Sequence, residues 1–400
     1  MNRIYMDHSA TTPVSERALN EMLPYFREEF GNPSAIYSYG QTGKNAIEKC
    51  RNRIAKCIGA LPTEIYFTSG GTESDNWAIR SVCEMKKDKG KHIISTEIEH
   101  NAVKRTLQDL EQQGFEVTYL KPDQRGQISA EQLESAIRDD TILITVMLAN
   151  NVVGTVLDIP ALAAAARKRR ILFHTDAVQA VAHIPVNVRK LGVDFLSISA
   201  HKFNGPKGVG VLFCRLPNRP KPLLTGGGQE KELRSGTENV PAIVGMTAAL
   251  EEHMETLEED ITVLTEWGSY MTKKISEIPG VHPTGDQENR LPGFSSFLIE
   301  GIPHSVMLMN KLNEQNICVS SGSACSASSK EASHVITALG YDEQMATCSL
   351  RITLGMDNTK EEVDYAIGAV QSSINALRSE VKSKAPRLEG RVSEIQGQAK

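Results

Sequence analysis

Lys202 lies in the stretch of the sequence whose residue types are most suggestive of chemistry. Residues 195–199 roughly alternate apolar and polar side chains, and residues 209–213 form a short apolar run, so both are expected to be strands. The glycines and proline between them predict a tight turn. A lysine fixed at a strand end can be desolvated and aimed at a carbonyl group, as a Schiff-base lysine must be. Taken alone, an exposed polar hairpin is the commoner explanation of such a segment.

A second candidate site lies where an expected strand at residues 64–69 leads into a helix. Gly70, Gly71 and Thr72 fall at this turn. Backbone N–H groups at a helix N-terminus, together with the helix dipole, favour an anion such as a phosphate. The Lys-Ser/Thr ending of a nucleotide P-loop is missing, which disfavours a nucleotide site of that kind. A simple helix cap formed by Thr72 explains the turn equally well.

Two more expected strands end in polar residues. His100 follows the strand expected at residues 92–95, and it could stack on a ring or exchange protons. Asn150 and Asn151 follow the apolar strand expected at residues 141–148, and their amides would lie at the sheet edge. A single loop histidine is more often incidental, and asparagines often only form turns. These residues therefore gain meaning only in combination with others.

Asp176 follows an apolar strand expected at residues 171–174. A carboxylate next to a buried strand is costly unless it has a charged partner. A protonated ring nitrogen would be such a partner. Gln179, about one helical turn further on, would point the same way.

All of these residues belong to one expected architecture. Between residues 64 and 213 short strands alternate with helical patterns, which is typical of an α/β fold with a mainly parallel sheet covered on both faces. Ligands of such sheets bind at the carboxyl ends of the strands. The pattern changes after residue 240 and indicates a smaller α+β unit. We expect a large domain at residues 15–258, and a small domain formed by residues 259–400 together with residues 1–14.

The strand ends together provide a turn that can bind a phosphate, an acidic side chain that can pair with a protonated ring nitrogen, amide groups, and a lysine positioned to react with a carbonyl group. Pyridoxal 5'-phosphate needs a phosphate grip, a counter-charge for its ring nitrogen and a Schiff-base lysine. We therefore predict that this edge of the sheet binds pyridoxal phosphate.

Composition and charge exclude several other classes of protein. The net charge of −5 and the lack of a sustained basic face argue against nucleic-acid binding. No apolar run approaches the roughly 20 residues of a membrane helix, and the N-terminus has no apolar signal core. The seven cysteines are scattered without a C-x-x-C pair, which is typical of reduced thiols. We expect a cytoplasmic protein without a metal site of its own.

Cys325 differs from the other cysteines in its surroundings. It lies within residues 320–330, a run of small and polar residues without an apolar anchor. A core cysteine would not be placed there, whereas a reactive thiol would, provided that something lowers its pKa or takes its proton. The alternative is an accidentally exposed cysteine.

Five motifs carry a resemblance to a known family. They are residues 99–101 (Glu-His-Asn), 174–179 (His-Thr-Asp-Ala-Val-Gln), 199–210 (Ser-Ala-His-Lys-Phe-Asn-Gly-Pro-Lys-Gly-Val-Gly), 234–239 (Arg-Ser-Gly-Thr-Glu-Asn) and 320–326 (Ser-Ser-Gly-Ser-Ala-Cys-Ser). The chain closely resembles the NifS/IscS-like cysteine desulfurases, which are fold-type I pyridoxal-phosphate enzymes of the aminotransferase class V group. The resemblance covers about residues 3–378.

The resemblance implies a role for each candidate residue. Lys202 would bind the cofactor covalently, and His100 would stack on its ring and move protons. Asp176 would pair with the ring nitrogen and Gln179 with the ring hydroxyl. The phosphate would be held by Gly71, Thr72, Ser199 and His201, and across a homodimer by Thr237. The substrate would be bound by Arg351 through its carboxylate, assisted by Asn151 and Asn32.

The same resemblance implies the reaction and the partners. L-Cysteine would be converted to L-alanine while Cys325 takes its sulfur as a persulfide. An iron–sulfur scaffold, tRNA thio-modification or nitrogenase maturation could then receive the sulfur, and Cys325 could ligate iron in a scaffold complex. Selenocysteine lyase and aminotransferase are the nearest alternatives. A non-catalytic sulfur carrier that uses the Cys325 run alone and a nucleotide-binding protein are alternatives of other classes.

Overall fold

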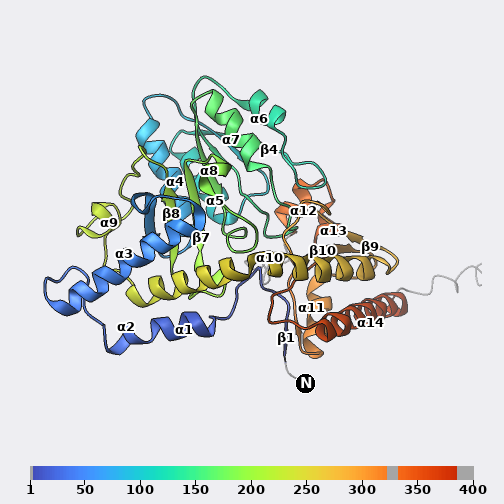
Figure 1. Ribbon diagram of the computed structural model, residues 1–400. Coiled ribbons are helices and arrows are strands. Elements are labelled where there is room, and N and C mark those ends of the chain that lie inside the picture. The colour runs from blue at the N-terminus through green and yellow to red at the C-terminus, as the bar shows by residue number, and fades with distance from the viewer. Residues whose placement is uncertain (1–2, 322–331, 385–400) are drawn as a thin grey trace, which may run out of the picture.

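The computed structural model describes residues 3–321 and 332–384 of the 400-residue chain. Its larger part is built around a seven-stranded sheet with the strand order β2-β8-β7-β6-β5-β3-β4 (Figure 1). The strands are β2 (Ile65–Thr68), β3 (His92–Thr96), β4 (Glu116–Leu120), β5 (Thr141–Thr145), β6 (Leu172–Asp176), β7 (Phe195–Ser199) and β8 (Gly210–Cys214). All neighbouring pairs are parallel except those that β8 makes with β2 and β7. The expected α/β fold class is confirmed.

Two strand boundaries differ from the sequence-based expectation. The strand expected at residues 141–148 ends at Thr145, and its pairing with β3 already stops at Ile144. The strand expected to end at residue 174 continues to Asp176, because Asp176 pairs with Ser197 of β7. The acidic side chain is therefore fixed on the sheet itself and does not belong to a loop that follows it.

Helices cover both faces of this sheet, as the alternation of buried strand residues requires. Ile93 and Leu143 join the apolar cluster beneath α4 and α5, whereas their neighbours Ile94 and Ile144 join the cluster on the opposite face. The helices of this part are α1 (Glu16–Met22), α2 (Pro24–Arg27), α3 (Ser38–Ile58), α4 (Gly71–Lys86), α5 (Asn101–Gln112), α6 (Ala130–Ala136), α7 (Ile159–Lys168), α8 (Val188–Leu191) and α9 (Gln229–Glu232). Short 3-10 turns occur at η1 (Pro62–Glu64) and η2 (Ala200–Lys202).

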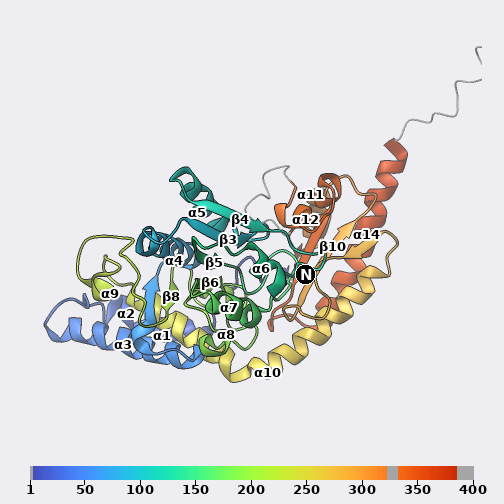
Figure 2. The same ribbon diagram turned by 90° about the horizontal axis from the view of Figure 1, so that it is seen from above.

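The smaller part lies beside the first and has its own apolar cluster (Figure 2). Its antiparallel sheet has the order β12-β10-β9, and a separate parallel pair joins β1 to β11. Its elements are β1 (Ile4–Tyr5), β9 (Val281–Pro283), β10 (Phe294–Ile299), β11 (Ile317–Cys318), β12 (Ser349–Thr353), α11 (Ser305–Glu314), α12 (His334–Ala338), α13 (Glu343–Ala346) and α14 (Lys360–Lys384). The pairing of β1 with β11 fixes the N-terminal segment against the C-terminal part of the chain.

One long helix connects the two parts. α10 (Val240–Ser276) begins among the helices of the larger part and ends against the smaller one, so the expected boundary between residues 258 and 259 falls inside it. A capping box starts the other long helix, α14: the Thr359 N–H donates to Glu362 and the Glu362 N–H donates to Thr359, both at 3.2 Å. No helix in the described part of the chain is long and apolar enough to cross a membrane.

Candidate active site

A cavity of about 540 Å³ opens at the carboxyl ends of the parallel strands. Strand ends, the start of α4, the N-terminal segment and β12 all contribute to its wall. Ten residues singled out from the sequence line it: Gly71, Thr72, His100, Asn151, Asp176, Gln179, Ser199, His201, Lys202 and Arg351. The structure therefore brings most of the candidate residues together, including residues 280 positions apart in the chain.

Lys202 is held at the end of η2, directly after β7. Its Nζ atom donates hydrogen bonds to the backbone oxygens of Ser9 at 2.6 Å and Ala10 at 2.9 Å. The N-terminal segment is itself tied to the lysine turn, because the Thr12 N–H donates to the backbone oxygen of His201 at 2.9 Å. The N-terminal segment thus directs the amine into the cavity.

The glycine turn between β2 and α4 allows two backbone segments to approach closely. A side chain on Gly210 would meet the Cα atom of Gly70 at 2.7 Å, and Gly70 itself has a φ of +147°. Helix α4 begins at the cavity wall, because its first residues, Gly71 and Thr72, line the cavity. The N–H groups of a first helical turn have no partner within the helix. The hydroxyl-bearing Ser199 and Thr72 line the same wall. This corner has the composition of an anion site.

Glu73 lies in the first turn of α4 and would oppose an anion if its charge were unpaired. Arg234 donates to both of its carboxylate oxygens, at 2.8 and 3.1 Å. Although burial acts in the opposite direction, the bonds from Arg234 and Ser69 hold the pKa of Glu73 below its usual value. The charge of Glu73 is therefore balanced locally, and the corner remains suited to a phosphate.

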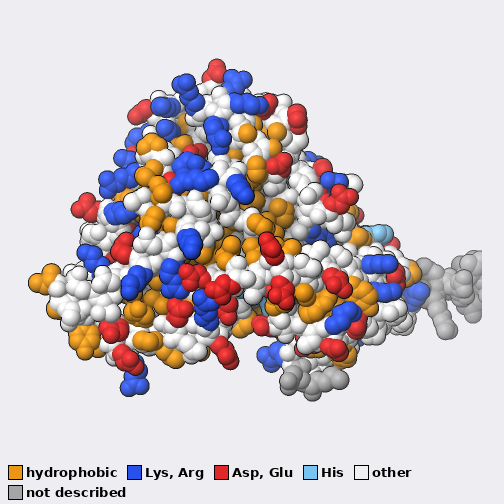
Figure 3. Space-filling view, viewed as in Figure 1, with side chains coloured by type: hydrophobic (Ala, Val, Ile, Leu, Met, Phe, Trp, Pro, Cys, Tyr) orange, Lys and Arg blue, Asp and Glu red, His pale blue; other side chains and the backbone are white. Residues whose placement is uncertain are grey.

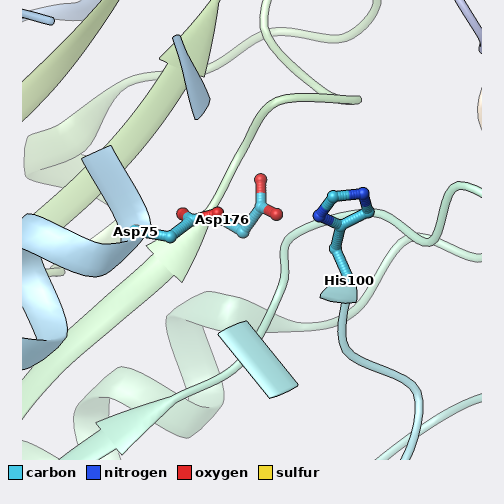
Figure 4. A group of neighbouring side chains, drawn as sticks. All are labelled: Asp75, His100 and Asp176. Carbon is cyan, nitrogen blue, oxygen red and sulfur yellow. The ribbon is translucent and has the colours of Figure 1, made fainter. Parts of the chain in front are cut away.

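His100 and Asp176 line the same cavity and face each other (Figure 4). The His100 Nδ1 atom accepts a hydrogen bond from the Ala102 N–H at 3.1 Å, so the proton of the neutral ring is on Nε2. Burial lowers the pKa of His100, which favours this neutral form. Burial raises the pKa of Asp176, while a bond from the Val178 N–H and the positive charge of Lys202 oppose that rise.

Arg351 enters the cavity from β12 and is only 2% exposed. Its Nη2 atom pairs with Asp7 at 2.6 Å, and its Nη1 atom donates to the backbone oxygen of Asn151 at 2.6 Å. Its Nε atom has no hydrogen-bond partner among the residues that the structure describes. A guanidinium group with an unused donor can bind a carboxylate.

Three of the residues to which the resemblance assigns a role do not line this cavity. Thr237 lines an adjoining hollow of about 240 Å³, which shares Ser69 and Gly208 with the cavity. Asn32 lies in the loop before α3, where its side chain accepts a bond from the Ser34 N–H. Cys325 lies outside the described residues. The described residues on both sides of that gap adjoin the site: Ser320 exchanges two backbone bonds with Arg351, and His334 lines the cavity.

Sequence reasoning missed several residues of the site. Ser9, Ala10 and Asp7 escaped because only the fold brings the N-terminus to Lys202 and Arg351. Asp75 could have been found, because it precedes Ala78, Ile79 and Val82 at helical spacing and so interrupts a buried stripe. A carboxylate on a buried helix face is costly, so its presence there indicates a functional role.

Known proteins resemble the chain in both sequence and structure. The sequence profile of the family described as aminotransferase class-V matches residues 4–366. The cysteine desulfurase IscS of Methanosarcina thermophila is 47% identical over 376 residues, which cover 94% of this chain and 93% of that protein. The chain is a cysteine desulfurase-family member of the class-V aminotransferases. The IscS of Dictyoglomus turgidum is 46% identical, again over 94% of this chain, and covers 95% of that protein.

Solved structures agree with this assignment. A NifS-like protein superposes with a TM-score of 0.88 at 39% identity, covering 94% of this chain and all of that one. The protein SspA, solved in complex with cysteine, gives a TM-score of 0.79 at 37% identity and covers 88% of this chain and 99% of that one. The larger part of the chain thus has the fold of the NifS-like, fold-type I enzymes, as the sequence motifs suggested.

Members of this family use pyridoxal phosphate, and the cavity fits that cofactor. It offers a glycine-rich helix start for the phosphate, a lysine for covalent attachment and a buried acid for the ring nitrogen. One oxygen of Asp75, one oxygen of Asp176 and one ring nitrogen of His100 lie within 4.8 Å of one another. A buried acidic pair of this kind calls for a positive group, which the protonated ring nitrogen would supply.

Proposed function

We propose that the protein converts L-cysteine to L-alanine and accepts the sulfur on Cys325 as a persulfide. The observation that carries the proposal is the meeting of Lys202, Asp176 and Arg351 in one cavity. These three side chains meet the needs of a pyridoxal-phosphate enzyme that acts on an amino acid. The similarity to proteins named cysteine desulfurase favours this reaction over selenocysteine lyase and aminotransferase activity.

Lys202 would hold the cofactor and later act as a base. When bound, pyridoxal phosphate supplies an electron sink that makes the bonds at the substrate Cα atom labile. Once free, the Lys202 Nζ atom would remove the Cα proton. The carbonyl oxygens of Ser9 and Ala10, which accept its hydrogen bonds, limit the space through which this amine can swing.

Asp176 and His100 would control protons around the ring. An ionised Asp176 would keep the ring nitrogen protonated. The neutral His100 ring, with its proton on Nε2, would stack on the cofactor and pass a proton to or from the substrate thiol. Gln179 would bond the ring hydroxyl, and it donates to the Ser9 backbone oxygen at 2.9 Å.

The phosphate and the substrate carboxylate would bind at separate places. Gly71, Thr72, Ser199 and His201 would hold the phosphate, and Thr237 would reach the phosphate bound by a partner subunit. Arg351 would bind the carboxylate of L-cysteine, near Asn151, whose backbone oxygen already orients the guanidinium group. Asn32 would assist from its loop. With the phosphate and the carboxylate bound at separate places, the substrate would lie between the cofactor and the smaller part of the protein.

Cys325 would complete the reaction by attacking the substrate sulfur. The Cβ–S bond breaks, its electron pair stays with carbon, and an S–S bond forms with Cys325. A proton then adds to Cβ, so that L-cysteine and the Cys325 thiol yield L-alanine and a persulfide. The persulfide would pass its outer sulfur to the thiol of an acceptor protein.

The proposed surroundings of the enzyme follow from several observations. Residues 19–39 expose a series of large apolar side chains, at the end of the molecule formed by α1, α2 and the start of α3 (Figure 3). They are Leu19, Leu23, Phe26, Phe30, Ile36, Tyr37 and Tyr39. A homodimer would cover such a surface. The six described cysteines are free thiols, which is compatible with a reducing cytoplasm.

We propose an iron–sulfur scaffold as the first sulfur acceptor, because the similar proteins carry the name IscS. Cys325 could ligate iron within such a complex. Acceptors for tRNA thio-modification or nitrogenase maturation are the alternatives. We also propose that residues 15–258 form the cofactor-binding domain, and that residues 259–400 with residues 1–14 form the smaller domain.

Incubation with L-cysteine tests the proposed reaction. The purified protein should release alanine and, with a reducing agent present, sulfide in equal amounts. Cys325→Ser should keep the absorbance of the bound cofactor and form no sulfide, whereas Cys57→Ser, a control at a half-buried cysteine, should behave like the unchanged protein. Formation of a keto acid in place of alanine would identify an aminotransferase and overturn the proposal.

A further inference from the structure

Asp75 is a buried acid at the candidate site to which the proposed reaction assigns no part. It lies on α4, about one helical turn after Gly71, and it is only 1% exposed. Neither of its carboxylate oxygens has a hydrogen-bond partner in the described part of the chain. Figure 4 shows its carboxylate directed toward Asp176, which lies between Asp75 and His100. An unpaired charge in such a place would be costly.

The neighbouring histidine does not supply a positive charge. His174 is on β6, two residues before Asp176, and therefore on the same face of the sheet. Its Nδ1 atom lies 2.8 Å from the Thr145 hydroxyl and its Nε2 atom 3.1 Å from the Ser197 hydroxyl. Its Nε2 atom is 3.5 Å from Asp75. Burial lowers the pKa of His174 to about 3, so the ring is neutral.

The other acids around Asp75 make a second charge still less favourable. Burial raises the pKa of Asp75 well above its usual range, and the charge of Asp176, together with that of Glu99 when it is ionised, adds to this effect, while the nearby Ser197 hydroxyl acts in the opposite direction. Two carboxyl groups that share a buried space cannot both ionise readily. Asp176 is the better place for the charge, because it accepts the Val178 N–H bond and because the positive charge of Lys202 lowers its pKa. Asp75 is therefore the carboxyl group of the pair that stays protonated.

We propose that Asp75 is a positioning residue that, as a neutral carboxylic acid, shares one proton with Asp176 and so holds a single negative charge opposite the ring nitrogen of the cofactor. This inference rests on the role of Asp176 in the proposed function. Two effects follow. The Asp75 O–H group orients the Asp176 carboxylate, and the pair carries the one charge that the protonated ring nitrogen balances.

A pair of variants of the cofactor-loaded enzyme tests this inference. Asp75→Asn keeps a donor for Asp176 and adds no charge, so the cofactor dissociation constant should stay within about threefold of the unchanged enzyme. Asp75→Ala removes the donor to a charged group, so the dissociation constant should rise by roughly 10- to 100-fold. The pH midpoint of the cofactor absorbance should be the same in Asp75→Asn and the unchanged enzyme, and shifted in Asp75→Ala.

Infrared spectroscopy provides a second readout that does not depend on either variant's affinity. The difference between the infrared spectra of the unchanged enzyme and of Asp75→Asn should contain the C=O band of a protonated carboxylic acid, because the band of the neutral Glu99 is present in both and cancels. This comparison holds even if Asp75→Ala fails to fold. The inference is wrong if the band is missing from the difference spectrum. It is equally wrong if Asp75→Asn weakens cofactor binding as much as Asp75→Ala, or if neither variant changes it. Failure of the unchanged enzyme to bind the cofactor would instead contradict the proposed function.

Discussion

Arg351 is oriented by protein oxygens before any substrate is bound. Asp7 and the backbone oxygen of Asn151 occupy its two terminal nitrogens, and its Nε atom is buried without a partner in the described chain. Arginine binds a carboxylate through two parallel N–H donors, and lysine cannot reproduce that geometry. The requirement at this position is therefore for the shape of the side chain as well as for its charge.

Replacement of Arg351 by lysine should weaken substrate binding. Loss of hydrogen bonds to a charged group is expected to raise the KM for L-cysteine by roughly 10- to 100-fold, while the absorbance of the bound cofactor stays the same. Steady-state kinetics measures the effect, with Arg17→Lys, at a partly exposed ion pair, as the control. An unchanged KM in Arg351→Lys would assign the carboxylate to another residue.

At the scale of single residues, the sequence predicts those whose type is unusual for their position. Lys202 and His100 follow strands and Asp176 ends one, at the sheet edge where the fold class alone indicates a ligand site. Asp7 and Ser9 could not be predicted in this way, because their partners Arg351 and Lys202 lie more than 190 positions away in the chain. Long-range pairing of this kind leaves no periodic signal in the sequence.

At the scale of elements, Glu99 joins the ends of two neighbouring strands. It follows β3, and its Oε1 atom accepts bonds from the Thr96 hydroxyl at 2.7 Å and from the Met147 N–H, just after β5, at 3.0 Å. Burial raises the pKa of Glu99 to about 8, although both bonds oppose that rise. The carboxyl group is thus neutral at pH 7 in the folded protein.

Glu99 should make the stability of the protein depend on pH. Its pKa is higher in the folded state than the value of about 4.5 in the unfolded chain, so the group contributes stability fully below pH 4.5. That contribution declines as the pH rises and is lost once the pH passes about 8. Glu99→Gln cannot ionise, so its stability relative to the unchanged protein should increase with pH across this window.

Urea unfolding at a series of pH values measures this difference. Glu97→Gln, at the half-buried glutamate two residues earlier, is the matched control for the same chemical substitution. Parallel stability curves for Glu99→Gln and the unchanged protein would show that Glu99 is ionised in the folded state.

The elements themselves could be predicted where their pattern is local. The helix start at Thr359 and Glu362 has a capping box that is visible in the sequence and present in the structure. The two-residue strand β1 has no such pattern, because Ile4 and Tyr5 are fixed only by pairing with Ile317 and Cys318. Strand ends also depend on neighbours: Asp176 joins β6 because Ser197 pairs with it.

At the scale of the whole molecule, the apolar surface of residues 19–39 is where the homodimer that we propose would form its contact. Ile36, at 93% exposure, is the most exposed large apolar side chain among the described residues. The loop that carries it also carries Asn32, which does not line the cavity of its own subunit. Contact between two copies through this loop would give both residues a partner.

Ile36→Asp should therefore weaken the homodimer by about tenfold or more, because it places a charge in an apolar contact. Sedimentation over a range of concentrations measures the dimer dissociation constant. Val381→Asp, at an exposed apolar residue of α14, is the control and should leave the dimer unchanged. An unchanged dimer in Ile36→Asp would place the contact elsewhere, and a monomeric unchanged protein would rule the homodimer out.

The transfer of sulfur to Cys325 is the central claim, and mass spectrometry after a single turnover tests it most directly. The enzyme loaded with cofactor would be mixed with L-cysteine that carries a heavy sulfur isotope, and its thiols would then be alkylated and digested. The account predicts one additional heavy sulfur atom on the peptide that contains Cys325, formed together with alanine. Alanine formation without that sulfur atom, or with the atom on another cysteine, would contradict the account.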